Sequence, residues 1–473
     1  MVFQNNVLLG AAGSGTTRYA IDQSIRFNDD DSAYMYKTFS GAGNQKKFTI
    51  SYWIKRSKLG VRQDMWSFQQ DVPLIFFSDD TIRVFLFGGT SLVTNRKFRD
   101  VGAWYHVVLT VDSTDSTSGD RIRLYINGQR ETSFSTESYP SQDADASVWT
   151  SGLQLRLFRL YGGTNYYDGY AAEIHYLDGI SYGPEFFGET TSNGLWVPKA
   201  YTGSYGSNGF KIDGRDSADL GDDESGNGND FTTSGLAAHD QISDSPSNNF
   251  ATFNSIYNDS NVISDLTYQN GNLQADGTGS GQFDYTVATY NLPKSGKWYF
   301  EHYLGGRYTG FGLCLYDQIS GITSGYGFGA LSTSQGFGFQ DNVVYNSNGV
   351  TVNFGIGASS AGDILNCALD VDNNKVFLGV NGTYYANDGG NDGNPSSGSN
   401  ETLTTSFSLS TNEILIGFYF STADGTSFIN FGQEGTFGGN KTAGGNSDAN
   451  GIGNFFNTVP TNYLALCSKN VGS

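Results

Sequence analysis

Two hairpin patterns, far apart in the sequence, most constrain how this chain can fold. Residues 121–130 read RIRLYINGQR, and residues 375–384 read KVFLGVNGTY. In each, apolar residues alternate with other residues and lead into Asn-Gly, the pair that most favours a two-residue hairpin turn. Each also follows a strand-like run that ends in or near Val-Asp, at 104–112 and 364–372. We therefore expect two β domains built on related patterns.

Alternation continues along most of the chain, whereas no long segment has the 3.6-residue period of a helix. In 48–55, FTISYWIK, one face of the expected strand carries Phe48, Ile50, Tyr52 and Ile54. Aromatic residues make up 15% of the chain and 63 of its 473 residues are glycine, so core side chains and turns are both abundant. The fold class predicted from this pattern is all-β, with two β-sandwich domains whose sheets bury their apolar faces against each other.

One segment breaks the alternation and indicates how the domains are divided. Residues 213–247 are acidic and rich in Gly, Ser and Asn, and few of them could form a core. We therefore expect one sandwich at 21–212, a linker at 213–247 and a second sandwich at 248–473. Residues 1–20 are expected to form an N-terminal arm.

The formal net charge of −20 and the sequence pI of about 4.4 limit the partners of the chain. Nucleic acid and anionic membrane surfaces are disfavoured, because binding to both relies on Lys and Arg. No apolar run approaches the roughly 20 residues of a membrane span, and the N-terminus lacks the basic region of a signal peptide. We expect no membrane insertion and assembly in a cytoplasm. The acidity fits either a solvated surface or carboxylate loops that hold Ca²⁺.

Two tyrosine-rich segments are candidates for carbohydrate binding, which combines aromatic rings with a few placed polar groups. The first segment contributes Asn165, Tyr166, Tyr167 and Asp168, and because Tyr166 and Tyr167 are adjacent, one of them must face outward if they lie in a strand. The second contributes Tyr384, Tyr385 and Asp388, beside the second Asn-Gly turn. The alternative for the first segment is an aromatic turn between core strands, and for the second a mobile loop packed by its own tyrosines.

Two acidic runs are candidates for Ca²⁺, a hard cation that takes six to eight oxygen ligands. The first contains Asp29, Asp30 and Asp31. The second contains Asp222, Asp223 and Asp230, with glycines at possible turning points, but it lacks the closing Glu and the flanking helices of an EF-hand. The alternative for both runs is a solvated acidic loop.

No residue pattern indicates catalysis. Glycoside hydrolysis needs a pair of carboxylates, and the nearest approach to such a pair is Glu173 with Asp178, around His175. Some concanavalin A-type hydrolases carry acidic residues at alternating positions of one strand. This segment lacks that pattern, because its other alternating positions are apolar or His. The chain also has no GxSxG, HExxH or P-loop motif. We expect a protein that is not an enzyme and has no cofactor apart from possible Ca²⁺.

The first half resembles a LamG-like, concanavalin A-type jelly roll across roughly residues 21–182. The matching segments are FTISYWIKR at 48–56, WYHVVLTVD at 104–112, LYINGQ at 124–129 and AEIHYLDG at 172–179. The resemblance implies a sandwich that recognises a surface, often a glycan, and Ca²⁺ binding, which is frequent in LamG-like domains.

The second half resembles a SPRY domain. The matching segments are SGKWYFEHYL at 295–304, GYGFG at 325–329, ALDVDNNKVFLGVNG at 368–382 and INFGQ at 429–433. Segments 245–256 and 459–471 are similar to those that flank SPRY domains in virion proteins of tailed bacteriophages.

Together these resemblances imply a phage virion structural protein, a fibre or appendage subunit located in the virion. The implied partners are other virion proteins and a host cell-surface glycan, and the resemblance to phage fibres implies a homo-oligomer such as a trimer. A first alternative is a capsid decoration or assembly protein that docks through residues 1–17. A polysaccharide depolymerase that uses Glu173 is the second alternative.

Overall fold

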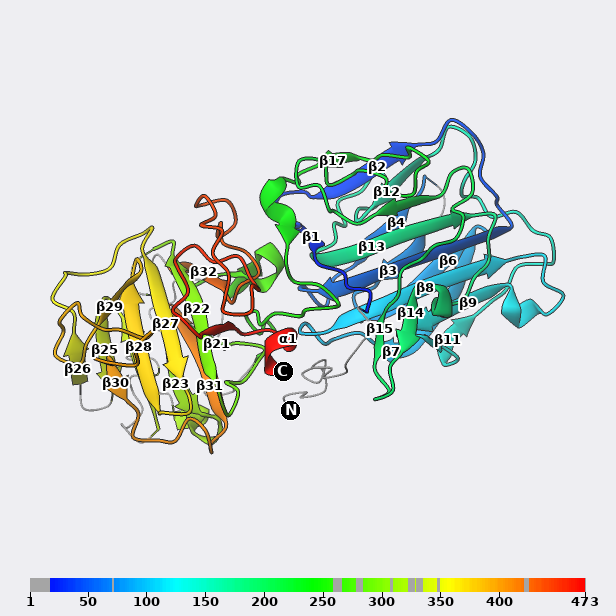
Figure 1. The fold of residues 1–473 in the computed structure, drawn as a ribbon. Helices are drawn as coiled ribbons and strands as arrows, with labels where there is room; N and C mark the ends of the chain where they lie inside the picture. Colours follow the sequence, from blue (N-terminus) through cyan, green and yellow to red (C-terminus); the bar gives the residue numbers. More distant parts are fainter. Residues whose placement is uncertain are drawn as a thin grey trace. The chain divides into compact units, whose positions relative to one another are not determined.

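The computed structural model describes residues 18–69, 72–257, 266–277, 284–306, 309–321, 328, 335–346, 349–420 and 425–472. They form two compact units that meet in sequence between Asn249 and Phe250. Each unit is a β-sandwich (Figure 1), so the predicted all-β class with two sandwiches is confirmed. No helix in the described part of the chain is long and apolar enough to cross a membrane. The expected docking arm, residues 1–17, lies outside the described residues.

The first unit has two eight-stranded sheets, sheet A and sheet B. Sheet A contains, in order, β10 (Gln129–Arg130), β9 (Ile122–Ile126), β8 (Trp104–Asp112), β3 (Lys47–Arg56), β13 (Gly169–Asp178), β1 (Ser24–Phe27) and β18 (Gln241–Ile242), and β16 (Phe210–Ile212) also pairs with β13. Sheet B contains, in order, β11 (Phe134–Glu137), β7 (Gly89–Lys97), β6 (Thr81–Leu86), β5 (Val72–Phe76), β4 (Gln63–Ser67), β12 (Gln154–Leu157), β2 (Tyr34–Thr38) and β17 (Thr232–Ser234). Outside these sheets lie β14 (Gly188–Thr190), β15 (Trp196–Pro198), η1 (Ser118–Asp120), η2 (Pro184–Phe186) and η3 (Ala238–Asp240).

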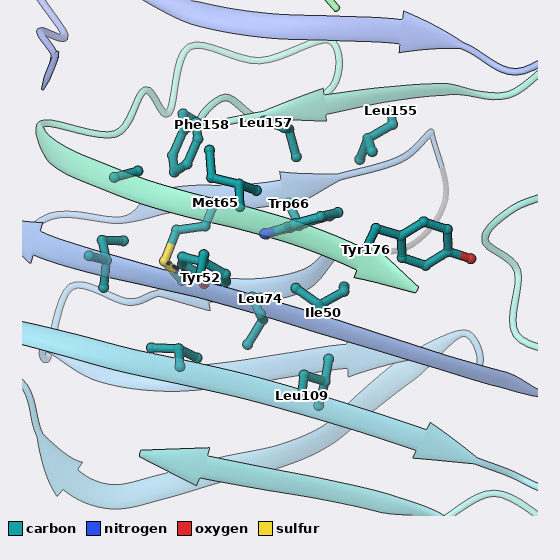
Figure 2. Close-up of a cluster of buried hydrophobic side chains, with 14 of the residues drawn as sticks. Ile50, Tyr52, Met65, Trp66, Leu74, Leu109, Leu155, Leu157, Phe158 and Tyr176 are labelled. Carbon is teal, nitrogen blue, oxygen red and sulfur yellow. Dashed lines mark hydrogen bonds between the residues drawn. The ribbon is translucent and has the colours of Figure 1, made fainter. Parts of the chain in front are cut away.

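The core of the first unit lies between sheets A and B. On β3, the face with Ile50 and Tyr52 packs inward as the alternation predicted, and Leu109 on β8 does the same. Figure 2 shows these side chains together with Met65 and Trp66 of sheet B, all of them fully buried. Because the two sheets meet through large apolar side chains, burial on this scale dominates the stability of the unit.

The outer face of sheet A is covered as well. On β3, Ser51 and Lys55 point away from the core, yet both are buried. The Oγ atom of Ser51 lies 2.9 Å from Nε2 of His106, and Nζ of Lys55 donates to Asp244 at 2.7 Å. Asp244 belongs to the polar segment that follows β16, which therefore packs on this unit.

This packing corrects the prediction that 213–247 is a linker between the sandwiches. The segment supplies β17, which pairs with β2, and β18, which pairs with β1. Asp240 forms a buried ion pair with Arg26 of β1 at 3.0 Å. The segment holds few apolar side chains, so it is fixed by strand pairing and charge pairing rather than by a core of its own.

Both predicted Asn-Gly hairpins are confirmed. Asn127 and Gly128, which connect β9 to β10, have φ values of 49° and 77°. Asn381 and Gly382 have φ values of 51° and 83° in the second unit. Positive φ at both central residues is the type I′ geometry that matches the twist of paired strands.

The second unit also has two sheets, sheet C and sheet D. Sheet C contains, in order, β19 (Thr267–Gln269), β20 (Gln274–Asp276), β32 (Thr426–Asn430), β22 (Lys297–Leu304), β27 (Ile364–Asp370), β28 (Lys375–Val380) and β29 (Thr383–Tyr385), while β30 (Leu403–Thr404) pairs with β28 and β33 (Leu464–Ala465) with β22. Sheet D contains, in order, β21 (Asp284–Val287), β31 (Ile414–Phe420), β23 (Thr309–Leu315), β24 (Gly336–Gln340), β25 (Val343–Asn346) and β26 (Gly349–Asn353). Outside these sheets lie η4 (Asn270–Asn272), η5 (Tyr316–Gly321) and α1 (Ser468–Val471).

A buried carboxylate anchors the C-terminal segment of the second unit to sheet C. Glu301 on β22 accepts hydrogen bonds from the backbone N–H groups of Phe456 (3.0 Å) and Asn457 (2.7 Å). It also accepts from the Tyr299 hydroxyl at 2.9 Å and from Asn430 Nδ2 at 3.2 Å. Burial raises the pKa of Glu301, whereas these donors oppose that rise. A loop that has little core of its own is thereby tied to a central strand.

Candidate functional site

The adjacent tyrosines of the first predicted carbohydrate segment point in opposite directions. Tyr166 is half-buried on the outside of the first unit, which confirms that one of the pair faces outward. Tyr167 is fully buried, and its hydroxyl donates to the carbonyl oxygen of Lys55 at 2.7 Å. The prediction of Tyr167 as a binding residue is therefore wrong, because the alternation into β13 places its ring in the core.

Tyr166 belongs to a larger cluster that we call the Tyr–Arg surface. Its members are half-buried and come from β2, β12 and the loop that follows β12: Tyr34, Tyr36, Arg156, Arg159, Tyr161 and Tyr166. β17, β2 and β12 are neighbours at one edge of sheet B (Figure 1). The surface thus lies on the outer face of that sheet, opposite the core.

Local sequence explains how the surface is built. In YMYKT, the alternation buries Met35 and turns Tyr34 and Tyr36 outward. The same alternation in QLRL turns Arg156 outward, directly opposite Tyr36 in the register. After β12, an isolated bridge between Arg159 and Tyr166 closes the loop and returns Tyr166 to the same face.

Rings and guanidinium groups follow one another across the Tyr–Arg surface. The Arg159 Cζ atom lies 4.7 Å from the centroid of Tyr34 and 4.9 Å from that of Tyr166. The Arg156 Cζ atom lies 5.7 Å from the Tyr34 centroid and 4.7 Å from the Tyr161 centroid. Tyr34 also stacks on Tyr36, with centroids 5.8 Å apart. Cation–π contacts at these distances fix the guanidinium groups beside the rings.

Asn165 borders the Tyr–Arg surface and contacts a buried carboxylate. Its side chain hydrogen-bonds to Asp64 of β4, which also forms an ion pair with Arg62 at 2.8 Å. Burial raises the pKa of Asp64, while Arg62 and Asn165 act in the opposite direction. Asp64 is therefore neutralised locally, and Asn165 is held next to Tyr166.

Asp168 does not belong to the Tyr–Arg surface. It is 2% exposed and lies beside Asp29, and burial followed by this neighbouring charge raises its pKa well above the ordinary range. Lys58 binds Asp29, and Asp30 contributes to the same acidic environment. The fold thus brings together part of the first calcium candidate and Asp168, which the sequence reasoning had assigned to a sugar.

Two of the acidic residues that are candidates for Ca²⁺ already have partners within the chain. Asp29 is paired with the Lys58 ammonium group, and Asp31 accepts a hydrogen bond from Asn28 Nδ2 at 2.8 Å. Within the described ranges, no group of three or more His, Cys, Asp or Glu residues is arranged to hold a metal ion. Ca²⁺ binding at Asp29–Asp31 stays a prediction.

The second acidic run forms a hydrogen-bonded loop. Asp223 accepts hydrogen bonds from the N–H groups of Lys211, Ser225 and Asn229 and from the hydroxyl of Ser225, at 2.8–2.9 Å. Asp230 accepts from the N–H of Asp223 at 3.1 Å. Burial and the nearby Asp230 raise the pKa of the exposed Asp222. The carboxylate of Asp223 is buried and occupied by donors that stabilise the loop, and Ca²⁺ binding at this run stays a prediction.

The predicted site in the second unit is not assembled. Tyr385 is 6% exposed and its ring stacks on Phe354 at 4.2 Å, within the core. Tyr384 packs beside Tyr299, and burial raises its pKa well above the ordinary range. Asp388 is exposed and accepts a hydrogen bond from the N–H of Gly390 at 2.9 Å, as in a local turn. The prediction of Tyr384 and Tyr385 as a sugar platform is wrong, because strand β29 pairs with β28 and its alternation sends the two rings to opposite faces of sheet C. Tyr385 enters the core, and Tyr384 packs against a second apolar cluster.

Glu173 is buried in a network of donors. It sits at a bulge of β13 with a φ of 47°, and its carboxylate contacts His175 Nε2 and Lys211 Nζ, each at 3.1 Å, and the Tyr19 hydroxyl. Burial opposes ionisation, but these partners lower the pKa of Glu173 to about 2. The side chain is 5% exposed, so the network holds its charge inside the unit.

A small cleft lies at the other end of the first unit. Its volume is about 170 Å³, and it lies between the β9–β10 hairpin and β11. Arg123, Arg130, Glu137 and Tyr139 are among its lining residues. A cleft of this size could accept one small polar group.

A region of the first unit matches a known family model. Residues 28–179 match the model described as the concanavalin A-like lectin/glucanases superfamily. This region is similar to a concanavalin A-like jelly-roll domain of the LamG type, and its two packed sheets agree with that fold. The match spans the core strands of both sheets and every member of the Tyr–Arg surface. No curated protein matches the chain.

Several solved structures are similar to parts of the chain. A "putative carbohydrate binding protein" from Bacteroides ovatus has 18% identity and a TM-score of 0.32, and the match covers 46% of this chain and 58% of that chain. The SPRY domain of human HERC1 has 18% identity and a TM-score of 0.23, with coverage of 35% and 91%. A heptameric SAP-like pentraxin from Limulus polyphemus has 16% identity and a TM-score of 0.26, with coverage of 34% and 78%. At these values the likenesses concern the fold alone.

Proposed function

We propose that this chain binds carbohydrate at the Tyr–Arg surface, and that it serves as a fibre or appendage subunit of a phage virion that attaches to host glycans. The observation that carries the binding proposal is the gathering of four tyrosines and two arginines on the outer face of sheet B. A jelly-roll domain of the concanavalin A type supports this role.

The chemistry of the surface suits a sugar chain. Aromatic rings offer flat apolar area to the C–H faces of sugars, while phenol and guanidinium groups supply hydrogen bonds to hydroxyl groups. Asn165, which is already fixed by Asp64, adds an amide at the border. These groups combine a large contact area with few flexible bonds, which reduces the entropy lost on binding.

The position of the surface also favours recognition. Tyr34, Tyr36 and Arg156 stand on paired strands rather than on free loops. Side chains on strands are held more precisely than those on loops, so the spacing between rings is set by the sheet. An extended glycan could lie along such a row and contact several members.

Binding of purified full-length chain to host polysaccharide by isothermal titration calorimetry tests this proposal. Tyr34→Ala and Tyr166→Ala are each expected to weaken binding by about tenfold or more, since base- and sugar-type stacking contacts contribute on the order of 1–3 kcal/mol. Tyr139→Ala, in the cleft at the opposite edge of sheet B, is the matched control and should leave binding unchanged. Loss of binding only in Tyr139→Ala would move the site to the cleft.

The virion part of the proposal is supported by the resemblance of segments 245–256 and 459–471 to phage virion proteins. Antibodies against the chain should label purified particles from a lysate in which it is expressed, as seen by electron microscopy. Particles without the chain would contradict this part alone. A particle-bound chain that binds no glycan would favour the decoration alternative.

We also propose that the chain is not an enzyme. Glu173, the residue considered for a depolymerase, is buried and occupied by His175 and Lys211. The test is the release of reducing ends from host polysaccharide, which is expected to stay at the level of the buffer. Release that disappears in Glu173→Gln, with folding intact by circular dichroism, would establish the depolymerase instead.

A further inference from the structure

Arg156 and Arg159 are held in place but keep donors available. Arg156 Nε donates to Gln154 Oε1 at 2.9 Å, and Arg159 Nε donates to the carbonyl oxygen of Gly163 at 3.0 Å. Among the described residues, the terminal nitrogens of both side chains have no hydrogen-bond partner. Each guanidinium group is therefore oriented by one bond and by its rings, with its remaining donors free to bind a ligand.

Neither Arg156 nor Arg159 forms an ion pair with a carboxylate in the described part of the chain, which is unexpected in so acidic a protein. Asp and Glu number 47 against 27 Lys and Arg. Arg26 and Arg56 of the same unit form buried ion pairs with Asp240 and Asp80, at 3.0 and 3.1 Å. In the described part of the chain, neither Arg156 nor Arg159 has an Asp or Glu within ion-pair distance.

Two acidic residues of this part of the first unit are engaged with other partners. Asp64 is fully buried and is paired with Arg62. On the neighbouring strand, Lys37 Nζ contacts the backbone oxygen of Asp230 at 3.2 Å, while the Asp230 carboxylate accepts from the Asp223 N–H. The Tyr–Arg surface is thus a local positive patch on a strongly negative molecule.

From this geometry we propose that the Tyr–Arg surface selects carbohydrate that carries a negative charge, a carboxylate or a sulfate. The inference rests on the proposed function and specifies its ligand class. A guanidinium group offers parallel N–H donors that match the two oxygens of such a group, while the adjacent tyrosines contact the sugar ring. Two such groups beside the ring of Tyr34 would suit a polymer with repeated charges.

Affinity electrophoresis and calorimetry with paired polymers test the inference. One pair is polygalacturonate and its carboxyl-reduced, neutral product, and the other is carrageenan and unsulfated agarose. We expect at least one charged polymer to bind about tenfold or more tightly than its neutral partner, with affinity that falls as salt increases. The pair that shows the difference identifies the carboxylate or the sulfate.

Variants connect the preference to the two arginines. Arg156→Gln and Arg159→Gln should each remove most of the preference for charge, measured as the ratio of the affinities for the charged and the neutral polymer. Arg96→Gln is the matched control, because Arg96 also lies over a ring of the same unit, Phe98 at 5.2 Å, but outside the Tyr–Arg surface. Thermal unfolding of each variant shows that the fold is kept.

The outcomes separate the inference from the proposed function. Equal affinity of the wild-type chain for charged and neutral members would overturn the inference and leave carbohydrate binding in place. A charge preference that survives in the double variant Arg156→Gln/Arg159→Gln, or is lost in Arg96→Gln, would also overturn it. Failure to bind any of the four polymers or host polysaccharide would overturn the proposed function itself.

Discussion

Arg159 and Tyr166 pair with each other twice, through a backbone bridge and through a guanidinium carbon that lies 4.9 Å from the ring centroid. The bridge fixes where the loop after β12 returns, and the cation–π contact fixes the direction of both side chains. Contacts within the chain therefore hold both side chains of the Tyr–Arg surface in place.

Removal of divalent cations should accordingly leave carbohydrate binding unchanged. We expect calorimetry to give the same dissociation constant for the glycan with EDTA in excess and with Ca²⁺ in excess. The charged group on Asp29 is already balanced by Lys58. Binding that disappears in EDTA and returns with Ca²⁺ would instead place the function at Asp29 and Asp168.

Gly128 is expected to tolerate alanine poorly. Its φ is 77°, and an added Cβ would lie 2.4 Å from the ring of Trp196. The left-handed backbone alone costs roughly 1–2 kcal/mol in a non-glycine residue, and the clash should add about 1–3 kcal/mol. Gly60 has a similar φ of 72° with open space around it, so Gly60→Ala isolates the backbone cost.

Calorimetric melting of the full chain compares the two glycine variants. Gly128→Ala should lower the melting temperature of the first unit by several degrees more than Gly60→Ala, on the order of 2–4 °C per kcal/mol. Equal shifts would show that the Trp196 ring moves aside without cost.

Features set by neighbouring residues could be predicted from the sequence. The Asn-Gly turns need only two residues with positive φ, and the inward face of β3 follows from alternation alone. The same rule stated that Tyr166 or Tyr167 must face outward. Alternation alone could not identify the outward tyrosine, because that depends on which face of the neighbouring strands packs against the core.

Features set by distant residues could not be predicted in this way. Tyr34, Tyr36 and Arg156 form half of the Tyr–Arg surface. The two tyrosines lie far from Tyr166 in the sequence and Arg156 lies in a separate strand, so only the order of sheet B brings them together. The alternation in YMYKT and QLRL was the available signal. Segment 213–247 was misassigned because polar residues such as Asp223 and Asp240 hold it through hydrogen bonds and ion pairs, which a count of apolar residues does not detect.

Glu301 is expected to be essential for the stability of the second unit. In Glu301→Gln, one acceptor oxygen becomes an amide donor that faces the N–H groups of Phe456 and Asn457 or the Tyr299 hydroxyl. Buried donors left without an acceptor cost about 1–3 kcal/mol each, so we expect a loss of roughly 2–5 kcal/mol in the free energy of unfolding.

Chemical denaturation followed by tryptophan fluorescence measures this loss. Glu413→Gln is the control, because the side chain of Glu413 is about half exposed and forms an ion pair with the exposed Lys294 at 3.5 Å. That variant should change stability by less than about 0.5 kcal/mol. A similarly small effect of Glu301→Gln would mean that the C-terminal segment is held by other contacts.

His302 should make the second unit sensitive to acid. It is fully buried between Phe311 and Phe418, neither ring nitrogen has a hydrogen-bond partner among the described residues, and burial lowers its pKa to about 3. The unfolded chain binds a proton near pH 6.5, so the stability contributed by neutral His302 is complete above pH 6.5 and is lost as the pH falls toward 3. Replacement by leucine removes both the titration and the two unsatisfied nitrogens.

His302→Leu is therefore expected to raise the free energy of unfolding by about 1–2 kcal/mol at pH 7, and by more at pH 4.5. Denaturation curves of wild type and variant at these two pH values measure the difference. His106, whose pKa burial also lowers to about 3, contacts Ser51 and Trp196 and belongs to the first unit, so the variant retains that source of acid sensitivity. A gain that is the same at both pH values would show that His302 does not titrate on unfolding, and a loss at pH 7 would show that the imidazole ring is needed for packing against Phe311 and Phe418.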